Sequence, residues 1–303
     1  MDENMKKIIR KLPQGLREKI EGLPPGIADN LEEIRVKAGA DSLIISEGRE
    51  INLHDREEST PEALEEILNR LLDYSYYAYE EELSKGYITI EGGHRVGICG
   101  RVSLKEDKVC LIKEVSSLNI RRSRQILGAS DKIIGSVCGG GVSNTLIISP
   151  PKCGKTTLLR DLARALSERG YRVGICDERS EIAGCFNGRT TYDLGSRTDI
   201  LDGCPKGEGI IMLIRAMSPD VIITDEIGKS EDACAIEEAL CAGVKIITTI
   251  HGNSFEDVAS SAVGGLIKNH IFETLIFLTA TPSTGTVRKI MKLSGMRRGG
   301  KGC

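Results

Sequence analysis

The chain has 303 residues, of which 40% are apolar and 28% charged, and its formal net charge is −3. This length allows two domains with separate cores, and the small net charge favours neither nucleic acid nor acidic lipid as a partner. Aromatic residues are scarce, with no Trp and four Phe, which argues against a base-stacking surface. No apolar run reaches the roughly 18–20 residues of a transmembrane helix, and the first residues lack a signal-peptide core. The ten cysteines form no Cys-x-x-Cys pair, so we expect a cytoplasmic protein with reduced thiols.

Residues 1–125 are predicted to form the smaller of two domains, of α+β type. An amphipathic helix is expected over residues 4–21, and a second helix over 60–72 begins with a capping Thr and a Pro. Strands are expected at 31–36, 42–45, 87–90 and 95–102, and the segment 117–122 ends this part of the chain.

Residues 126–303 alternate strands with helices. Apolar strands are expected at 146–148, 171–176, 221–224 and 245–250, and helices from residue 156, over 209–217 and over 231–240. Near-continuous apolar strands separated by helices predict an α/β domain in which helices cover both faces of a parallel sheet. In such sheets the chemistry gathers at the carboxyl ends of the strands.

The first of these strands runs into a loop that ends in Gly-Lys-Thr and then into a helix. A strand, a tight loop and a helix in this order form the P-loop that holds a nucleoside triphosphate. Lys155 is expected to contact the β- and γ-phosphates, and the Thr156 hydroxyl to ligate Mg²⁺. Ser149 stands where the pattern has glycine, which we expect to slow or weaken nucleotide use. The predicted nucleotide-binding residues are Ser149, Pro150, Pro151, Lys152, Cys153, Gly154, Lys155, Thr156 and Thr157.

Polar residues follow the other three strands. Asp225 and Glu226 come after the short strand 221–224, and are predicted to hold Mg²⁺ and to polarise the attacking water, respectively. Asp177, Glu178 and Glu181 follow another strand, and either of the first two competes with Glu226 as the general base. Three neighbouring carboxylates repel one another unless a cation such as Arg179 or Mg²⁺ neutralises them. His251 follows the last strand, where it can contact the γ-phosphate or relay its loss.

Four segments of the chain resemble one protein superfamily, that of the type II and type IV secretion and pilus-motor ATPases. These segments are Ser149–Asp161, Asp177–Gly184, Ser218–Gly228 and Thr248–Asn253. Asp177, Glu178 and Glu181 stand at the superfamily's acidic box, and His251 at its histidine box. The chain has Asp225-Glu226 where secretion motors have Gly-Glu, and Ala216 where they carry an arginine. These departures, with residues 92–97 and 118–122, resemble the sporulation branch of the superfamily.

The resemblance implies a RecA-like P-loop ATPase domain at 126–303 and a homohexameric ring to which the domain at 1–125 contributes intersubunit contacts. ATP and Mg²⁺ are the implied ligands, with ATP bound between the two domains of a chain. An arginine from a neighbouring subunit completes such sites and accelerates turnover by orders of magnitude. The candidates are Arg95, Arg101, Arg121 and Arg122, with Arg189 and Arg197 as alternatives.

The function implied by the resemblance is that of an ATPase on the mother-cell side of a channel between mother cell and forespore. It would couple ATP hydrolysis to transport or channel assembly, and would be peripheral to the membrane through a membrane-embedded channel component. One alternative is a nucleic-acid-associated P-loop NTPase, although only the short stretch at 296–301 is basic. A second alternative is a slow, nucleotide-gated scaffold.

Overall fold

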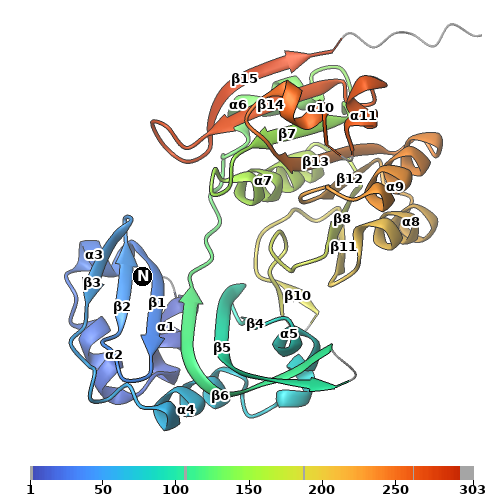
Figure 1. The fold of residues 1–303 in the computed structure, drawn as a ribbon. Helices are drawn as coiled ribbons and strands as arrows, with labels where there is room; N and C mark the ends of the chain where they lie inside the picture. Colours follow the sequence, from blue (N-terminus) through green and yellow to red (C-terminus); the bar gives the residue numbers. More distant parts are fainter. Residues whose placement is uncertain (1–2, 106–107, 187, 262, 294–303) are drawn as a thin grey trace, which may run out of the picture. The chain divides into compact units, whose positions relative to one another are not determined.

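The computed structural model describes residues 3–105, 108–186, 188–261 and 263–293, so the basic stretch at 296–301 lies outside the described residues. The chain divides into two compact units (Figure 1): an N-terminal unit of residues 1–123 and 184–191, and a sheet-and-helix unit of residues 124–183 and 192–303. The chain therefore crosses from one unit to the other three times, after residues 123, 183 and 191. The predicted domain boundary after residue 125 falls beside the first crossing, whereas the sequence pattern gave no sign of the inserted segment 184–191.

The N-terminal unit is built on an antiparallel sheet of six strands in the order β3-β2-β1-β6-β5-β4. Its elements are α1 (Glu3–Lys11), α2 (Gln14–Glu21), α3 (Pro25–Asp29), β1 (Leu31–Lys37), β2 (Leu43–Ser46), β3 (Arg49–Asn52), α4 (Pro61–Leu71), the 3-10 helix η1 (Tyr76–Tyr79), α5 (Glu80–Ser84), β4 (Tyr87–Ile90), β5 (His94–Lys105), β6 (Lys108–Arg121), β9 (Cys185–Phe186) and β10 (Arg189–Thr190). The last two strands pair as a small hairpin.

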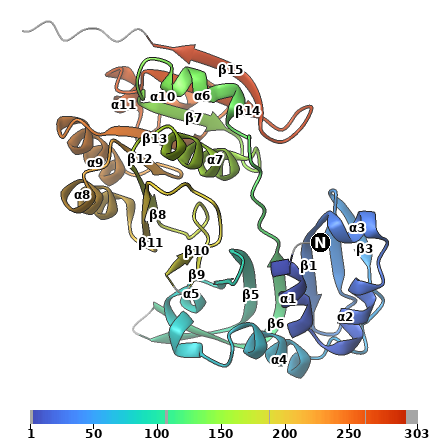
Figure 2. The same ribbon diagram turned by 180° about the vertical axis from the view of Figure 1, so that it is seen from behind.

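The core of this unit lies between the sheet and helices α1, α2 and α4 (Figure 2). Met5 of α1, Ile20 of α2 and Leu64 of α4 are fully buried in one apolar cluster with strand residues such as Ile34. The single helix expected over residues 4–21 is two helices, because Pro13 adopts an extended conformation between them. Proline lacks the N–H that a continuous helix needs at that position.

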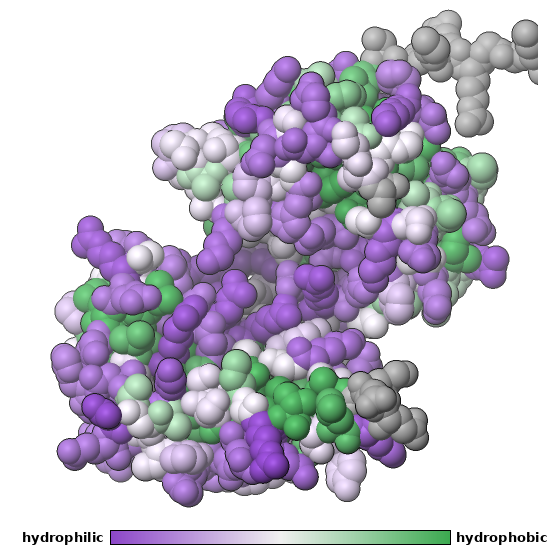
Figure 3. All heavy atoms as spheres, viewed as in Figure 1, coloured by the Kyte–Doolittle hydropathy of each residue, from purple (hydrophilic) through white to green (hydrophobic). Residues whose placement is uncertain are grey.

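The second half of β5 and the start of β6 present apolar side chains to solvent. Figure 3 shows a green patch beside the grey trace of residues 106–107, and the exposed apolar residues of these strands include Val102, Leu104 and Val109.

The sheet-and-helix unit contains seven strands in the order β11-β8-β12-β13-β7-β14-β15. All neighbouring pairs are parallel except the edge pair β14 and β15. Its elements are α6 (Asp131–Cys138), β7 (Thr145–Ser149), α7 (Lys155–Glu168), β8 (Val173–Asp177), β11 (Thr198–Asp202), α8 (Lys206–Met217), β12 (Val221–Thr224), α9 (Ser230–Cys241), β13 (Lys245–His251), α10 (Phe255–Ala259), α11 (Gly264–Lys268), β14 (Thr274–Thr279) and β15 (Thr286–Lys292).

Helices cover both faces of this sheet. One apolar cluster joins the sheet to α8, α9, α10 and α11 through buried residues that include Ile210, Ile236 and Ile246. Helix α7 packs against β8, β12 and β13 and against α6. Because five of the strands are buried over nearly their whole length, they consist largely of Ile, Val and Leu.

Candidate active site

The strand β7 carries the chain into the phosphate loop. All of its residues are buried, and the Ser149 hydroxyl donates to the next carbonyl in the chain at 2.9 Å. The loop then turns through Lys152 and Gly154, which have φ values of 61° and 82°. A Cβ on Gly154 would also lie 3.2 Å from Thr284 Cγ2. Glycine is therefore required there by both conformation and space, whereas serine fits the first position.

The helix α7 begins directly after this turn, so the free N–H groups of its first turn face the loop. Thr156 and Thr157 lie in that first turn and are half-buried. Pro151 and Lys152 are exposed, and Cys153 is buried with its thiol 3.6 Å from the Pro151 carbonyl oxygen. Backbone donors, rather than loop side chains, therefore form most of the cradle for a phosphate.

The Lys155 ammonium lies inside this loop. Its Nζ is 3.1 Å from the carbonyl oxygen of Pro150, 3.5 Å from that of Ser149 and 3.0 Å from Nδ1 of His251. Burial lowers the pKa of Lys155, and the charge of Glu226 opposes that shift. The lysine is thus held at the loop by neutral acceptors that a phosphate can replace.

His251 connects this lysine to a carboxylate. It ends β13, which lies between β7 and β12, and its register partner on β7 is Ser149. Its Nε2 lies 2.9 Å from Oε1 of Glu226, and both side chains are partly exposed. Nδ1 of the ring therefore faces the Lys155 ammonium and Nε2 faces the Glu226 carboxylate, so the two ring nitrogens contact groups of opposite charge. Lys155, His251 and Glu226 form a continuous chain of close polar contacts.

Glu226 is positioned by its own backbone as well. Its N–H donates to the Thr249 hydroxyl at 2.9 Å, and the next N–H, of Ile227, donates to the Thr249 carbonyl oxygen at 2.9 Å. Strand β13 therefore positions both partners of the histidine–carboxylate contact. It carries His251 at its end, and its Thr249 binds the backbone of Glu226 and Ile227.

Asp225 is buried beside a lysine that the sequence analysis did not select. Nζ of Lys206 lies 3.3 Å from Oδ1 of Asp225 and also contacts Oε2 of Glu178. Burial raises the pKa of Asp225 despite this lysine. Burial also opposes the charge of Glu178, but the hydrogen bond and charge of Lys206 leave its pKa lowered. Lys206 begins α8 three residues before the predicted start of that helix, so the sequence pattern left it in a loop.

Asp177 has a different environment from the other acids. Its side chain is 0% exposed, and it accepts hydrogen bonds from the N–H groups of Glu181, Ile182 and Ala183 at 3.0, 2.9 and 2.8 Å. Burial raises its pKa to about 6, although the backbone donors lower it. The carboxylate holds the following loop in place and is shielded from bulk water, whereas Glu226 is accessible.

The residues at this edge of the sheet fit a nucleotide with Mg²⁺. Mg²⁺ is held in phosphate-transfer sites by one or two carboxylates, water and the phosphates themselves. Oδ1 of Asp225 is buried and has an ion pair but no hydrogen bond of good geometry, so a lone pair remains for a metal ligand. Among the described residues, no cluster of three His, Cys, Asp or Glu side chains is arranged to bind a metal without such additional ligands.

Comparisons with known proteins identify the family to which the chain belongs. The family model described as "Sporulation stage III, protein AA" matches residues 2–298. Stage III sporulation protein AA of Bacillus subtilis (strain 168) is 42% identical over 298 residues, which cover 96% of each chain. The chain belongs to the stage III sporulation protein AA family.

Solved structures show the fold of this family member. It is similar to the pilus retraction motor PilT with bound ADP, with 16% identity and a TM-score of 0.59 over 89% of this chain and 80% of that one. It is also similar to the ATPase DotB of Legionella pneumophila, with 15% identity and a TM-score of 0.55 over 90% of this chain and 75% of that one. The predicted α/β fold of a P-loop ATPase is confirmed by these structures, and the predicted resemblance to the sporulation branch is confirmed by the family model and the Bacillus subtilis relative. None of the described helices is long and apolar enough to cross a bilayer.

The four arginine candidates of this family member all lie in the N-terminal unit, on β5, β6 and the residue after β6. Arg95 stacks on the Tyr87 ring at 3.9 Å, and Arg101 pairs with Glu114 at 3.2 Å. Arg121 lies 3.5 Å from Glu33, and Arg122 donates to the Asp29 carbonyl at 2.6 Å. The alternatives Arg189 and Arg197 lie in β10 and just before β11. The role of each as a trans-acting group stays a prediction.

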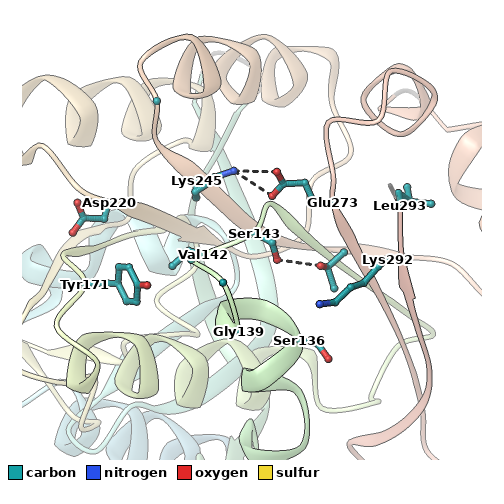
Figure 4. A pocket seen from close by; sticks show the side chains of 14 residues that line it. Ser136, Gly139, Val142, Ser143, Tyr171, Asp220, Lys245, Glu273, Lys292 and Leu293 are labelled. Carbon is teal, nitrogen blue, oxygen red and sulfur yellow. Dashed lines mark hydrogen bonds and ion pairs between the residues drawn. The ribbon is translucent and has the colours of Figure 1, made fainter. Parts of the chain in front are cut away.

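A cavity of about 740 Å³ lies at the opposite edge of the same sheet (Figure 4). It is lined by the turn at 139–143 and by residues at the starts of β13 and β14, including Lys245, which contacts both carboxylate oxygens of Glu273 at 3.2 Å. The phosphate loop lies at the carboxyl ends of these parallel strands, so this cavity is separate from the candidate nucleotide site.

Proposed function

We propose that the protein is a Mg²⁺-dependent ATPase that hydrolyses ATP to ADP and phosphate. The observation that carries this proposal is the chain of close polar contacts from Lys155 through His251 to Glu226. It joins the phosphate-binding loop to an accessible carboxylate that follows the buried Asp225. The P-loop ATPase fold and the relationship to secretion-type ATPases support the same activity.

Each residue of the site has a distinct proposed role. Lys155 and the N–H groups of the loop bind the β- and γ-phosphates, and Thr156 and Asp225 hold Mg²⁺. When bound, the metal neutralises charge on the phosphates. Glu226 accepts the proton of the attacking water, and His251 orients that carboxylate through Nε2.

The proposed base is Glu226 rather than Asp177 or Glu178. The Asp177 carboxylate is engaged by three backbone N–H groups, and Glu178 is paired with Lys206. Glu226 alone of these three acids is joined to the histidine that contacts Lys155.

We also propose that the protein works as a homohexameric ring in the cytoplasm, docked on a membrane-embedded channel component of the sporulating cell. Hydrolysis would drive transport or channel assembly. One of Arg95, Arg101, Arg121 and Arg122 would act in a neighbouring subunit. Membership of the family supports the sporulation context, and the exposed apolar hairpin of β5 and β6 supports a contact surface on the N-terminal unit.

ATP hydrolysis by the purified full chain tests the activity. Lys155→Ala and Glu226→Gln are each expected to lower kcat at least ~100-fold, because they remove a phosphate ligand and the proton acceptor. Glu226→Gln should still bind nucleotide. Glu231→Gln, an exposed carboxylate at the start of α9, is the matched control. Unchanged hydrolysis in the first two variants would show that the site is assigned wrongly.

Three further measurements on the same sample distinguish the wider proposals. Molecular mass with and without nucleotide tests the hexamer. Stimulation of hydrolysis by single-stranded DNA, with the steep salt dependence of phosphate contacts, would favour the nucleic-acid-associated NTPase. A single-turnover rate that stays near zero while nucleotide binds would favour the scaffold.

A further inference from the structure

Arg160 is a buried arginine in the middle of α7, the helix whose N-terminus forms the phosphate loop. Its three kinds of donor nitrogen contact three backbone carbonyls. Nε donates to Ile182 at 2.8 Å, Nη2 to Glu181 at 2.7 Å and Nη1 to Arg124 at 2.6 Å. The face of the guanidinium stacks on the ring of Tyr192 at 3.6 Å.

These contacts coincide with the three places where the chain crosses between its two units. Arg124 is the first residue after the first crossing, and Tyr192 is the first residue after the third. Glu181 and Ile182 come just before the second crossing, which follows Ala183. One side chain of the phosphate-binding helix therefore touches every segment by which this unit is joined to the N-terminal unit.

The same segments are fixed to one another and to the site. Asp177, at the end of β8, accepts the N–H groups of residues 181–183, whose carbonyls at 181 and 182 accept from Arg160. The Gln125 side chain exchanges two hydrogen bonds with the backbone of Asp193, at 2.6 and 3.0 Å, and so joins the first crossing to the third. The loop before the second crossing is held from both sides.

The chemistry of these contacts is specific to arginine. The planar guanidinium offers five N–H donors in a fixed arrangement and a flat face for stacking, whereas a lysine ammonium offers a point charge on a flexible chain. Burying this charge costs free energy that the hydrogen bonds and the stacked ring offset. An apolar side chain of similar volume would fill this place without that cost, but it would contact none of the three carbonyls.

We propose that Arg160 is a positioning residue that couples the phosphate-binding helix to all three crossings. A nucleotide bound at the N-terminus of α7 then shifts or steadies the backbone that leads to the N-terminal unit. This inference rests on the proposed nucleotide site. It identifies α7, Arg160 and the crossing segments as the element through which occupancy of that site reaches the other unit.

Hydrogen exchange of the full-length protein tests this coupling. The variants are Arg160→Gln and Arg160→Lys, and the control is Arg164→Gln, one turn further along α7, whose side-chain partners Asp161 and Glu168 lie in the same helix. Exchange is measured at the amides of residues 181–183 and 193, with and without a non-hydrolysable ATP analogue and Mg²⁺. Nucleotide affinity, kcat and KM are measured on the same preparations.

In the wild type and in Arg164→Gln, the analogue is expected to slow exchange at these amides by at least ~5-fold. In both Arg160 variants exchange without nucleotide is expected to be faster and to respond little to the analogue. Affinity should stay within about threefold and KM should be unchanged, while kcat falls by at least ~10-fold. A helix that Arg160 merely stabilised would lose affinity and melting temperature without losing the nucleotide response.

The coupling is refuted if the Arg160 variants respond to the analogue as the wild type does. If Arg160→Gln does not fold, Arg160→Lys carries the comparison. A wild-type protein that binds no nucleotide would overturn the proposed function instead. In that case exchange without nucleotide still tests whether Arg160 holds the crossing segments. Equal exchange in Arg160→Lys and wild type would show that it does not.

Discussion

Replacing Lys206 by methionine should destabilise the metal-free protein, because it removes the positive charge beside two acids of the site. Lys206 is buried, and its ammonium contacts both Asp225 and Glu178. Methionine keeps the volume of the side chain and removes the charge. Without Mg²⁺, two carboxylates are then left beside each other in a poorly hydrated place.

The size of the effect follows from the burial of the partners. Removing one member of a buried ion pair costs about 3–5 kcal/mol. Because the Glu178 side chain is 30% exposed, water hydrates part of its carboxylate. We therefore expect a loss of stability of about 2–3 kcal/mol. With a urea m-value of about 2 kcal/mol/M, the unfolding midpoint should fall by about 1–1.5 M.

Urea unfolding of the metal-free protein measures this shift. Asp225→Asn and the double variant complete a double-mutant cycle, and the double variant should be more stable than the two single losses predict by at least ~1 kcal/mol. Lys245→Met is the matched control, because its partner Glu273 forms a pair whose side chains are 34% and 41% exposed. That control should lose at most about 1 kcal/mol.

Saturating nucleotide with Mg²⁺ should recover more stability in Lys206→Met than in the wild type, since the metal supplies the missing positive charge beside Asp225. The reasoning is refuted if Lys206→Met and Lys245→Met lose the same stability, or if the cycle shows no coupling between Lys206 and Asp225.

Three other predictions follow from the site. Burial raises the pKa of Asp177 to about 6 from 3.8, and a carboxyl whose folded-state pKa is raised stabilises the fold as the pH falls through that value. As the pH falls from 7.5 to 4, the free energy of unfolding of the wild type should therefore rise by up to about 3 kcal/mol relative to that of Asp177→Asn. Thermal unfolding at several pH values measures this difference, and a difference that does not vary with pH contradicts the prediction. Gly154→Ala places a Cβ at a φ of 82° against Thr284 and should weaken binding of a fluorescent nucleotide at least ~10-fold, whereas Gly140→Ala, which meets open space, should bind as the wild type does. His251→Ala breaks the contact with Glu226 and should lower the single-turnover rate by about 10²–10⁴ with nucleotide affinity nearly unchanged; an unaltered rate would remove His251 from the mechanism.

Much of the candidate site follows from local sequence, because parallel strands bring their carboxyl ends to one edge. An apolar run that stops at a polar residue marks each part of the site. Such runs precede the phosphate loop, the acids at the ends of β8 and β12 and the histidine at the end of β13. Their spatial grouping then follows from the sheet alone.

The different surroundings of the acids in the folded chain could not be predicted in the same way. Asp177 and Asp225 both follow a buried strand, yet the first is enclosed by the backbone of its own loop and the second by Lys206, which is distant in sequence. The role of Arg160 has no local sequence signal, because its partners lie 21 to 36 positions away in the chain. Such contacts depend on how loops fold back, and local periodicity carries no information about them.

The three crossings also restrict how copies of the chain can assemble. A terminal domain on a single linker can be exchanged between copies. Here the hairpin of β9 and β10 belongs to the N-terminal unit, while the chain on either side of it belongs to the other. Exchange would require residues 1–123 and this hairpin to leave together and to be accepted together by another copy. We therefore expect each subunit of any oligomer to keep its own pair of units, so that contacts between subunits form between surfaces that are already folded.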